Sequence, residues 1–304
     1  MSELIDLVER QCRRWLEAQR NVQDSTSNRP FIVGISGPQG SGKTTLTREL
    51  EQRLARSSTP LTAVSLSLDD FYLTYDEQEA LAAKNPENDL LRYRGNPGTH
   101  DVPLAMKTLN ALVAAHTDVR IPRYDKGLRA GRGDRLPFEQ WDAVSPPFDV
   151  VLLEGWCVGF ECMEEGASLE PLRLDPFIDP PIATLLPHVT KYPSAHIQLL
   201  NEYLRKYHAL WKWLDVLVHI CASDINDVYL WRKQQEEALR KSATHGRGGL
   251  SDSEVEDFVD RFMPGYLIGL RSLQLSVDLG NRKLGGYMRV TLDVHRSVNM
   301  ILIA

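Results

Sequence analysis

Apolar side chains recur along the chain with two different periods, and these predict its secondary structure. From Leu4 to Leu16 they recur at spacings of three and four, which predicts an amphipathic helix over residues 2–20. Residues 21–30 are polar and end in a proline, so we expect a linker there. Further helices are predicted over residues 43–56, 76–84, 104–116, 195–213, 224–241 and 253–271.

Short apolar runs alternate with these helices. FIVGIS (31–36) is almost uniformly apolar, which suits a parallel strand that is buried on both faces. The predicted strands cover residues 31–36, 61–68, 119–122, 149–155 and 215–221, with two further β-like stretches at 274–279 and 287–294. Alternating strands and helices predict an α/β fold, in which helices cover both faces of a parallel sheet.

Few segments interrupt this pattern. Residues 160–194 hold six prolines and several acids, and we interpret them as an irregular insertion. We find no linker after residue 31 that would divide the chain, so residues 31–304 are predicted to form one domain behind an N-terminal helix and linker (1–30).

Composition excludes several classes of protein. The 304 residues include 35 Lys and Arg against 41 Asp and Glu, and a net charge of −6 disfavours a general nucleic-acid binder. No apolar run approaches the roughly 18 residues of a membrane helix. Four cysteines without a CxxC pair indicate neither a disulfide scaffold nor a zinc site. The first 30 residues lack the apolar core of a signal peptide, so we expect a cytoplasmic protein.

The most specific motif lies between the strand at 31–36 and the helix at 43–56. It has the form GxxxxGK[ST], the phosphate-binding loop or P-loop. Its glycines let backbone N–H groups approach phosphate oxygens, Lys43 brings a positive charge, and Thr44 offers a hydroxyl to Mg²⁺. The predicted nucleotide-binding residues are Gly37, Pro38, Gln39, Gly40, Ser41, Gly42, Lys43, Thr44 and Thr45.

The nucleotide is predicted to be ATP. GTPases usually carry a guanine-reading NKxD loop late in the chain, and the nearest strings here begin at Thr190 and Asn281. Both lack the aspartate.

Carboxylates follow two of the predicted strands. Asp69 and Asp70 follow the second, and Glu154 ends the fourth. Ligands of parallel sheets bind beyond the carboxyl ends of the strands, where such acids could hold Mg²⁺ or orient an attacking hydroxyl. Neighbours on a strand face opposite ways, so Asp69 and Asp70 are not both expected at one site. The candidate metal ligands are Thr44, Asp69 and Glu154. A solvated turn or a helix cap is the alternative for the acids.

Two polar loops are rich in arginine, which suits bidentate capture of a carboxylate or phosphate. Their residues could instead form a surface network of salt bridges. The candidate substrate-binding residues in and near these loops are Asp70, Tyr72, Arg94, His100, Asp101, Arg123, Tyr124, Lys126 and Arg132.

A third basic segment, residues 224–262, carries glycines at a joint and could form a lid over the phosphates. Arg232 is its leading catalytic candidate, since it lies just beyond the fifth strand. The same segment also holds nine acids, so a solvated helical hairpin is the alternative.

Seven blocks together resemble the D-glycerate 3-kinase family, which groups with uridine kinase, pantothenate kinase and phosphoribulokinase among the P-loop kinases. The likeness runs over about residues 31–290. The blocks are GISGPQGSGKTT, SLDDFYLT, RYRGNPGTHD, IPRYDKGLRAGRGDR, LLEGWCVGF, LWRKQQEEAL and FVDRFMPGY.

The resemblance implies a P-loop NTPase-type three-layer sandwich with five parallel strands in the order 2-3-1-4-5 and a helical lid. It also implies that Asp69 acts as base, that Glu154 lies near the metal and that Arg232 is the lid arginine. Residues 160–194 have no counterpart in uridine kinase.

These patterns lead to one principal hypothesis. The chain is predicted to be a kinase that uses ATP and Mg²⁺ to phosphorylate a small hydroxy acid, with the 3-hydroxyl of D-glycerate as acceptor. Lys43, Asp69 and Arg232 are its catalytic candidates. The alternatives are another small-molecule P-loop kinase, resembling uridine or pantothenate kinase, and an ATP-gated binding protein without an acceptor. The sequence does not indicate an oligomeric state.

Overall fold

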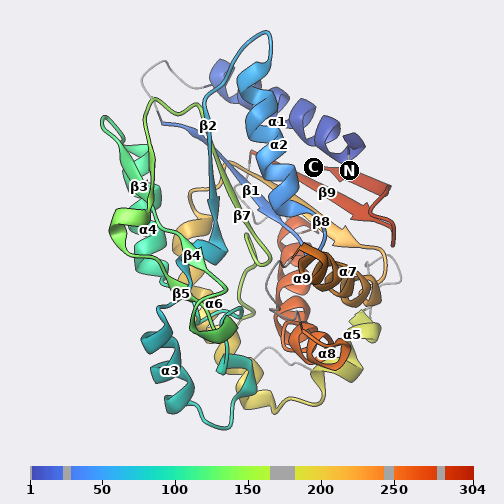
Figure 1. The fold of residues 1–304 in the computed structure, drawn as a ribbon. Coiled ribbons are helices and arrows are strands. Elements are labelled where there is room, and N and C mark those ends of the chain that lie inside the picture. Colours follow the sequence, from blue (N-terminus) through green and yellow to red (C-terminus); the bar gives the residue numbers. More distant parts are fainter. Residues whose placement is uncertain (1, 23–28, 165–181, 243–249, 279–284) are drawn as a thin grey trace.

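A six-stranded sheet forms the centre of the computed structural model, which describes residues 2–22, 29–164, 182–242, 250–278 and 285–304 (Figure 1). Its strands lie in the order β10-β9-β8-β1-β7-β2, and all pairs are parallel except β10 with β9. The strands are β1 (Phe31–Ser36), β2 (Ala63–Ser67), β7 (Val150–Gly155), β8 (Val216–Ala222), β9 (Gly286–Leu292) and β10 (Val298–Ile303).

One predicted strand lies outside the main sheet. The stretch at 119–122 was predicted as the third strand of the main sheet, but β3 (Val119–Ile121) pairs antiparallel with β6 (Asp142–Val144) outside it. The physical reason is that β3 is short and exposes Arg120 on one face, so it cannot be buried on both. Counted along the chain, the five parallel strands of the sheet lie in the order 2-3-1-4-5, but β7, β8 and β9 hold the third, fourth and fifth places that were predicted for 119–122, 149–155 and 215–221.

Helices cover both faces of the sheet, so the predicted three-layer α/β fold is confirmed. Helices α1 and α2 pack on one face, and α4, α6 and α9 pack together on the other (Figure 1). The helices are α1 (Ser2–Val22), α2 (Lys43–Arg56), α3 (Tyr75–Lys84), α4 (Val102–Val113), α5 (Ile182–Val189), α6 (Ser194–Trp211), α7 (Asn226–Ser242), α8 (Asp252–Asp260) and α9 (Met263–Asp278).

Several short elements complete the described structure. They are 3₁₀ turns and a two-stranded ribbon, namely η1 (Leu68–Phe71), η2 (Asp89–Leu91), η3 (Arg129–Gly131), η4 (Phe138–Gln140), β4 (Tyr124–Asp125) and β5 (Asp134–Arg135). The predicted β-like stretch at 274–279 is wrong as far as Asp278, because those residues continue helix α9. Residue 279 lies outside the described residues.

Helix α1 belongs to the hydrophobic core. Leu4 and Val8 are fully buried, and the Trp15 indole packs so closely against Gly286 that a Cβ there would lie 2.2 Å from its Nε1. After the undescribed residues 23–28, Arg29 forms an ion pair with Asp215 at 2.5 Å. The helix predicted at 2–20 is therefore present, and its Trp15 packs against the start of β9.

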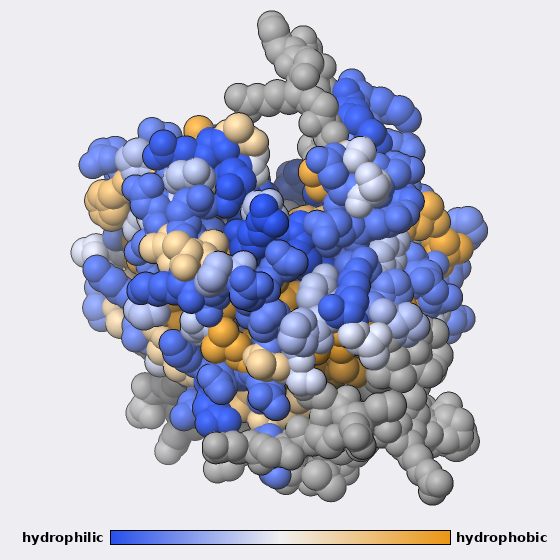
Figure 2. All heavy atoms as spheres, turned by 90° about the horizontal axis from the view of Figure 1, so that it is seen from below, coloured by the Kyte–Doolittle hydropathy of each residue, from blue (hydrophilic) through white to orange (hydrophobic). Residues whose placement is uncertain are grey.

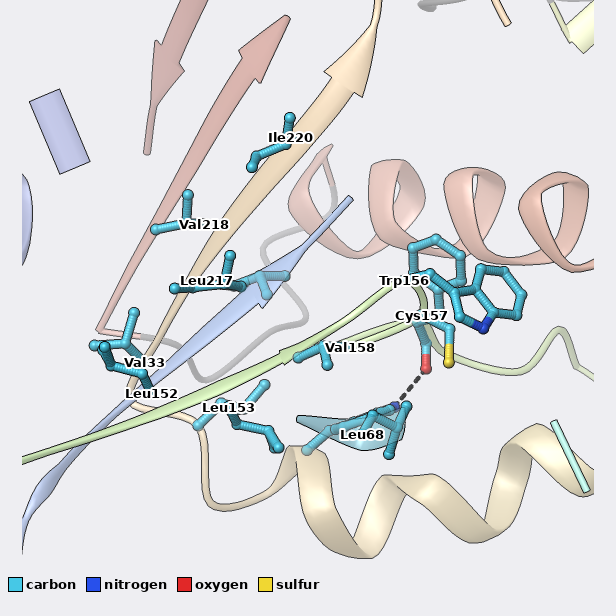
Figure 3. Packing of buried hydrophobic residues seen from close by; sticks show 14 of the residues in the cluster. Val33, Leu68, Leu152, Leu153, Trp156, Cys157, Val158, Leu217, Val218 and Ile220 are labelled. Atoms are coloured by element: carbon cyan, nitrogen blue, oxygen red, sulfur yellow. Dashed lines mark hydrogen bonds between the residues drawn. The ribbon is translucent and has the colours of Figure 1, made fainter. Parts of the chain in front are cut away.

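The central strands are buried along their whole length, as their apolar runs predicted. Every residue of β1, β7 and β8 is buried. Figure 3 shows side chains from these strands, such as Val33, Leu152 and Val218, packed with Leu68 and Trp156. At the carboxyl edge of the sheet, β1 leads into the P-loop and β7 carries Glu154 near its end.

The surface is mixed in character. The face in Figure 2 is mainly hydrophilic, and its hydrophobic side chains gather in small groups. Within the described helices, none combines the length and the apolar character needed to cross a bilayer.

Two predicted segments are described only in part. Residues 165–181 of the insertion and residues 243–249 of the lid joint lie outside the described residues. Helices α7 and α8 form the described arms of the lid segment and contact each other beside the P-loop edge of the sheet (Figure 1). Within the predicted irregular insertion, residues Ile182–Val189 form helix α5, so that prediction is wrong there. The lid and the domain boundaries stay predictions.

Candidate active site

A cleft of about 550 Å³ opens at the carboxyl end of the parallel strands and contains most of the P-loop. Among the predicted nucleotide-binding residues, the cleft is lined by Gln39, Gly40, Gly42, Lys43, Thr44 and Thr45. Gly37 and Pro38 line a small apolar cavity beside it, and Ser41 is buried within the loop. The loop thus joins β1 to the first turn of α2, whose N-terminus favours anions.

Two glycines of the loop adopt conformations that other residues rarely take. Gly40 has φ of 73° and Gly42 has φ of 90°. A Cβ at Gly40 would lie 2.7 Å from the Cβ of Trp231 on α7. Glycine is therefore required at position 40 both by the backbone and by the close approach of α7.

Lys43 lies at the floor of the cleft. Its Nζ donates to the Pro38 carbonyl at 2.9 Å. Burial lowers the pKa of Lys43, while the nearby carboxylates of Glu154 and Asp69 oppose that shift. A buried ammonium beside a helix N-terminus is suited to neutralise phosphate charge.

Thr44 and Glu154 face each other across the cleft. The Thr44 hydroxyl donates to Glu154 Oε1 at 3.0 Å. Burial raises the pKa of Glu154, and Lys43 opposes the shift. A hydroxyl and a carboxylate are hard oxygen ligands of the kind that Mg²⁺ prefers. The donor set thus fits Mg²⁺, with Asp69 as a further oxygen donor lining the same cleft.

Asp69 is held between a phenol and an ammonium group. Its Oδ1 accepts from the Tyr72 hydroxyl at 2.7 Å, and its Oδ2 pairs with Lys126 Nζ at 2.5 Å. Burial alone would raise the pKa of Asp69, but Lys126 and the Tyr72 hydroxyl outweigh it and hold that pKa well below its ordinary value. Asp69 is therefore an ionised, oriented carboxylate at neutral pH.

Asp69 lines the cleft and Asp70 does not, so the two do not share one site, as predicted; both lie on the 3₁₀ turn η1, however, and not on a strand as the prediction assumed. Its carboxylate accepts from Arg123 Nη1 at 2.6 Å and from the backbone N–H of Tyr124 at 3.2 Å. Arg123 also pairs with Asp142 at 2.7 Å. These contacts hold the start of the 123–135 loop in place. Neither Asp70 nor Arg123 lines the cleft, so the structure does not support them as substrate-binding residues.

His100 lies behind Tyr72 and does not line the cleft. The two rings stack with centroids 4.6 Å apart, and His100 Nδ1 contacts the Tyr207 hydroxyl at 2.7 Å. Burial lowers the pKa of His100 to about 4, so its ring is neutral at pH 7. His100 thus supports Tyr72, which does line the cleft.

Three other loop residues also lie outside the cleft. Asp101 caps α4 through the N–H of Leu104 at 2.9 Å. Arg132 pairs with Glu79, and its guanidinium lies over the Tyr93 ring at 4.8 Å. The Tyr124 ring packs edge-on against Tyr72. These residues hold the loop in shape instead of facing a ligand.

Arg94 is the arginine of the two substrate loops that lines the cleft. Its Nη1 donates to the carbonyls of Gly131, at 3.0 Å, and of Arg132. Within the described parts of the chain, no carboxylate pairs with it, unlike Arg123 and Arg132. Arg94 therefore joins the two loops and brings a positive charge to the cleft that Asp69 also lines.

Arg232 enters the cleft from α7, as predicted. It pairs with the buried Glu236, and its guanidinium lies over the Phe258 ring of α8 at 4.5 Å. Burial lowers the pKa of Arg232, with Glu236 opposing the shift. The arginine thus links both described arms of the lid segment to the cleft.

Sequence reasoning missed several lining residues. Trp156 directly follows the Glu154-Gly155 pair and donates through its indole N–H to Gly95 O at 2.8 Å; its position after the strand was an available signal. Arg296 lies in the β9–β10 turn, far from any motif, and no local pattern marks it.

Comparison with known proteins agrees with this geometry. The profile of the Phosphoribulokinase / Uridine kinase family matches residues 32–162. The uncharacterized kinase mug58 of Schizosaccharomyces pombe is 42% identical over 278 residues, which are 90% of this chain and 92% of that protein. The chloroplastic D-glycerate 3-kinase of Arabidopsis thaliana is 38% identical over 85% of this chain, which spans only 53% of the plant protein.

A solved structure extends the likeness to the whole fold. D-glycerate 3-kinase from Cryptococcus neoformans superposes with a TM-score of 0.81 at 28% identity, and the match covers 98% of each chain. The resemblance first seen in the sequence blocks is thereby confirmed. The chain belongs to the phosphoribulokinase/uridine kinase family of P-loop kinases and, within it, is similar to D-glycerate 3-kinases.

Proposed function

We propose that the protein is an ATP- and Mg²⁺-dependent kinase that phosphorylates the 3-hydroxyl of D-glycerate. One observation carries the proposal. A single cleft holds the P-loop lysine, the Thr44–Glu154 pair, the ionised Asp69 and Arg94, which has no carboxylate partner among the described residues. Two of the relatives described above are named D-glycerate 3-kinases, which supports this choice of acceptor.

The P-loop side of the cleft binds the triphosphate in this proposal. Backbone N–H groups of the loop and Lys43 hold the phosphates, and Thr44 and Glu154 are the proposed Mg²⁺ ligands, whereas Asp69, the third candidate from the sequence, is assigned to the acceptor. When bound, Mg²⁺ neutralises the charge that builds up on the phosphate oxygens during transfer.

Asp69 orients the acceptor hydroxyl. The hydroxyl oxygen bonds to the γ-phosphorus while the bond to the β–γ bridging oxygen breaks, and ADP leaves. Phosphoryl transfer has a loose transition state, so the hydroxyl proton is lost late. A carboxylate of low basicity, such as Asp69, is therefore sufficient to orient the hydroxyl. The proton then passes to solvent.

Arg94 and Arg232 complete the site. Arg94 is the proposed ligand of the glycerate carboxylate, since a planar guanidinium can bind both carboxylate oxygens. Arg232 on α7 supplies positive charge near the transferred group. Phe258 and Phe262 line the same cleft and would help exclude water, which otherwise competes as acceptor.

A panel of acceptors tests this function. The protein is incubated with MgATP and, separately, D-glycerate, L-glycerate, uridine or pantothenate, while ADP release and the phosphorylated product are measured. We expect D-glycerate to give 3-phosphoglycerate. Stimulation by uridine or pantothenate but not by glycerate would assign another small-molecule kinase, and inorganic phosphate as the sole product would favour an ATP-gated binding protein.

Replacing Arg94 tests which arginine binds the acceptor. Arg94→Met is expected to raise the KM for D-glycerate by about 100-fold, because it removes a charged partner of a desolvated carboxylate. The KM for ATP should change little. Steady-state kinetics with each substrate varied give both constants. Arg132→Met is the matched variant, since Arg132 pairs with Glu79 outside the cleft; an equal rise in its glycerate KM would contradict the assignment.

Removing Lys126 tests how Asp69 is kept ionised. In the native protein Asp69 stays deprotonated well below neutrality, so its protonation should not limit kcat between about pH 5 and 8. In Lys126→Met the ion pair is lost while the burial remains, so the pKa of Asp69 rises. We therefore expect the acid limb of the kcat profile to move to higher pH. An acid limb that stays in place would show that Lys126 does not control Asp69.

A further inference from the structure

The turn between β9 and β10 is closed by hydrogen bonds and holds an arginine in a rare backbone conformation. The Asp293 carboxylate accepts from the N–H groups of His295, at 2.9 Å, and Ser297, at 2.8 Å. The Arg296 N–H donates to the Asp293 carbonyl at 2.9 Å. Arg296 itself has φ of 62°, in the left-handed region that L-residues seldom occupy. Such strain tends to persist where a function depends on the position of a side chain.

Arg296 reaches from this turn to the P-loop, although more than 250 residues separate them. Its Nε donates to the Gly40 carbonyl at 2.7 Å, and its Nη1 donates to Gln234 Oε1 on α7 at 2.8 Å. The guanidinium also lies over the Trp231 ring at 5.3 Å. One side chain thus bridges the P-loop and the first turns of the lid segment.

The turn holds α7 by a second bond. The Trp231 indole N–H donates to the Val294 carbonyl at 2.8 Å. Trp231 is fully buried and leaves no space for a Cβ at Gly40. The P-loop, α7 and the turn are therefore packed as one unit at Gly40.

The bond to Gly40 has a direct electrostatic consequence for an anion. A P-loop binds phosphate through N–H groups, and a carbonyl oxygen turned toward the phosphate would repel it. The N–H and C=O of one peptide unit point in opposite directions, so anchoring the Gly40 oxygen also fixes the direction of the Ser41 N–H, which donates to the Pro38 carbonyl at 3.3 Å inside the loop. A guanidinium on that oxygen further offsets its partial negative charge.

We propose that Arg296 is a positioning residue for the nucleotide, which fixes the Gly40–Ser41 peptide and couples the P-loop to α7. The inference deepens the proposed function and rests on its nucleotide, a nucleoside triphosphate, but not on the identity of the acceptor. Arg296 contacts Gly40, Trp231 and Gln234, whereas the proposed acceptor residues Asp69 and Arg94 bind other partners. Its effect should therefore fall on the nucleotide.

Two substitutions separate positioning from mere stability. Arg296→Met removes the charge and both hydrogen bonds. Arg296→Gly removes the same groups but relieves the left-handed backbone, which glycine adopts without strain. Arg120→Met is the control, because Arg120 is exposed on β3 and donates to Trp141 O away from the cleft. Affinity for MgATP and for a non-hydrolysable analogue is measured by calorimetric titration without acceptor, and unfolding by thermal melting without nucleotide.

We expect both Arg296 variants to bind MgATP at least about tenfold more weakly, with Arg120→Met at the wild-type value. Arg296→Gly should keep a melting temperature near that of the native chain, and the acceptor KM at saturating ATP should be unchanged in both.

Affinity within twofold of wild type in both variants would overturn the inference, as would a loss of affinity that occurs only with a large fall in melting temperature. Nucleotide binding is measured without acceptor. The test of Arg296 therefore remains valid even if glycerate proves not to be the substrate. Native protein that binds no MgATP would overturn the inference and the proposed kinase together.

Discussion

Lys43→Ala is expected to lower kcat by about 10³-fold or more while the fold stays intact. Lys43 is the buried cation of the P-loop, and its ammonium group lies beside the Thr44–Glu154 pair. Without it, the charge that develops on the phosphates is no longer neutralised in a site shielded from water. Alanine favours the helical conformation that α2 requires at this position.

Initial rates with saturating MgATP and D-glycerate measure this effect, and circular dichroism with a thermal melt checks the fold. Lys233→Ala is the matched control, since Lys233 lies on α7 but pairs with Glu256 at 2.9 Å outside the cleft. The role of Lys43 would be contradicted by a folded Lys43→Ala protein whose kcat falls less than about tenfold.

Asp69→Asn is expected to lower kcat by about 10²- to 10⁴-fold and to change the affinity for ATP much less. Asparagine has nearly the same shape, so it can still contact Tyr72 and Lys126. It lacks the negative charge that orients the acceptor hydroxyl and receives its proton. The effect should therefore appear in turnover and spare nucleotide binding.

Steady-state kinetics and a separate ATP titration distinguish this role from metal binding. Equal losses in kcat and in MgATP affinity would instead make Asp69 a metal ligand or a structural residue. Asp70→Asn is the neighbouring control. Because Asp70 binds Arg123 away from the cleft, we expect that variant to lose about 1–3 kcal/mol of stability and little turnover.

The parts of the fold that the sequence predicted are those with strong local signals. The strand at 31–36 is almost entirely apolar, and the glycine-rich loop after it matches the P-loop motif. Strand β1, the P-loop and helix α2 therefore lie where they were predicted. The apolar face from Leu4 to Leu16 likewise predicted α1.

The remainder depends on partners distant in sequence. The run at 119–122 looked like a strand of the main sheet, but a strand's partner is set by tertiary packing, and Arg120 is exposed on β3. The stretch near residue 275 was predicted as β-like from its composition, but it continues helix α9. That helix packs through Gly265 and Gly269 against Trp156 and Phe160.

The candidate site shows the same division. Residues next to a strand end, such as Asp69 and Glu154, could be placed from topology alone. The roles of Arg94 and Arg132 could not be separated, because arginines in one loop cluster look alike until their carboxylate partners are known. Arg296 could not be predicted as a site residue from the sequence, because its contact with Gly40 exists only when the β9–β10 turn is folded against the P-loop.

A crystal structure with a non-hydrolysable ATP analogue, Mg²⁺ and D-glycerate tests the central claim most directly. The account predicts a triphosphate on residues 37–45, with its terminal phosphate beside Lys43 and the glycerate 3-hydroxyl between that phosphate and Asp69. Electron density that leaves the P-loop without nucleotide, or that shows Asp69 and Glu154 directed away from the bound phosphate, would contradict it.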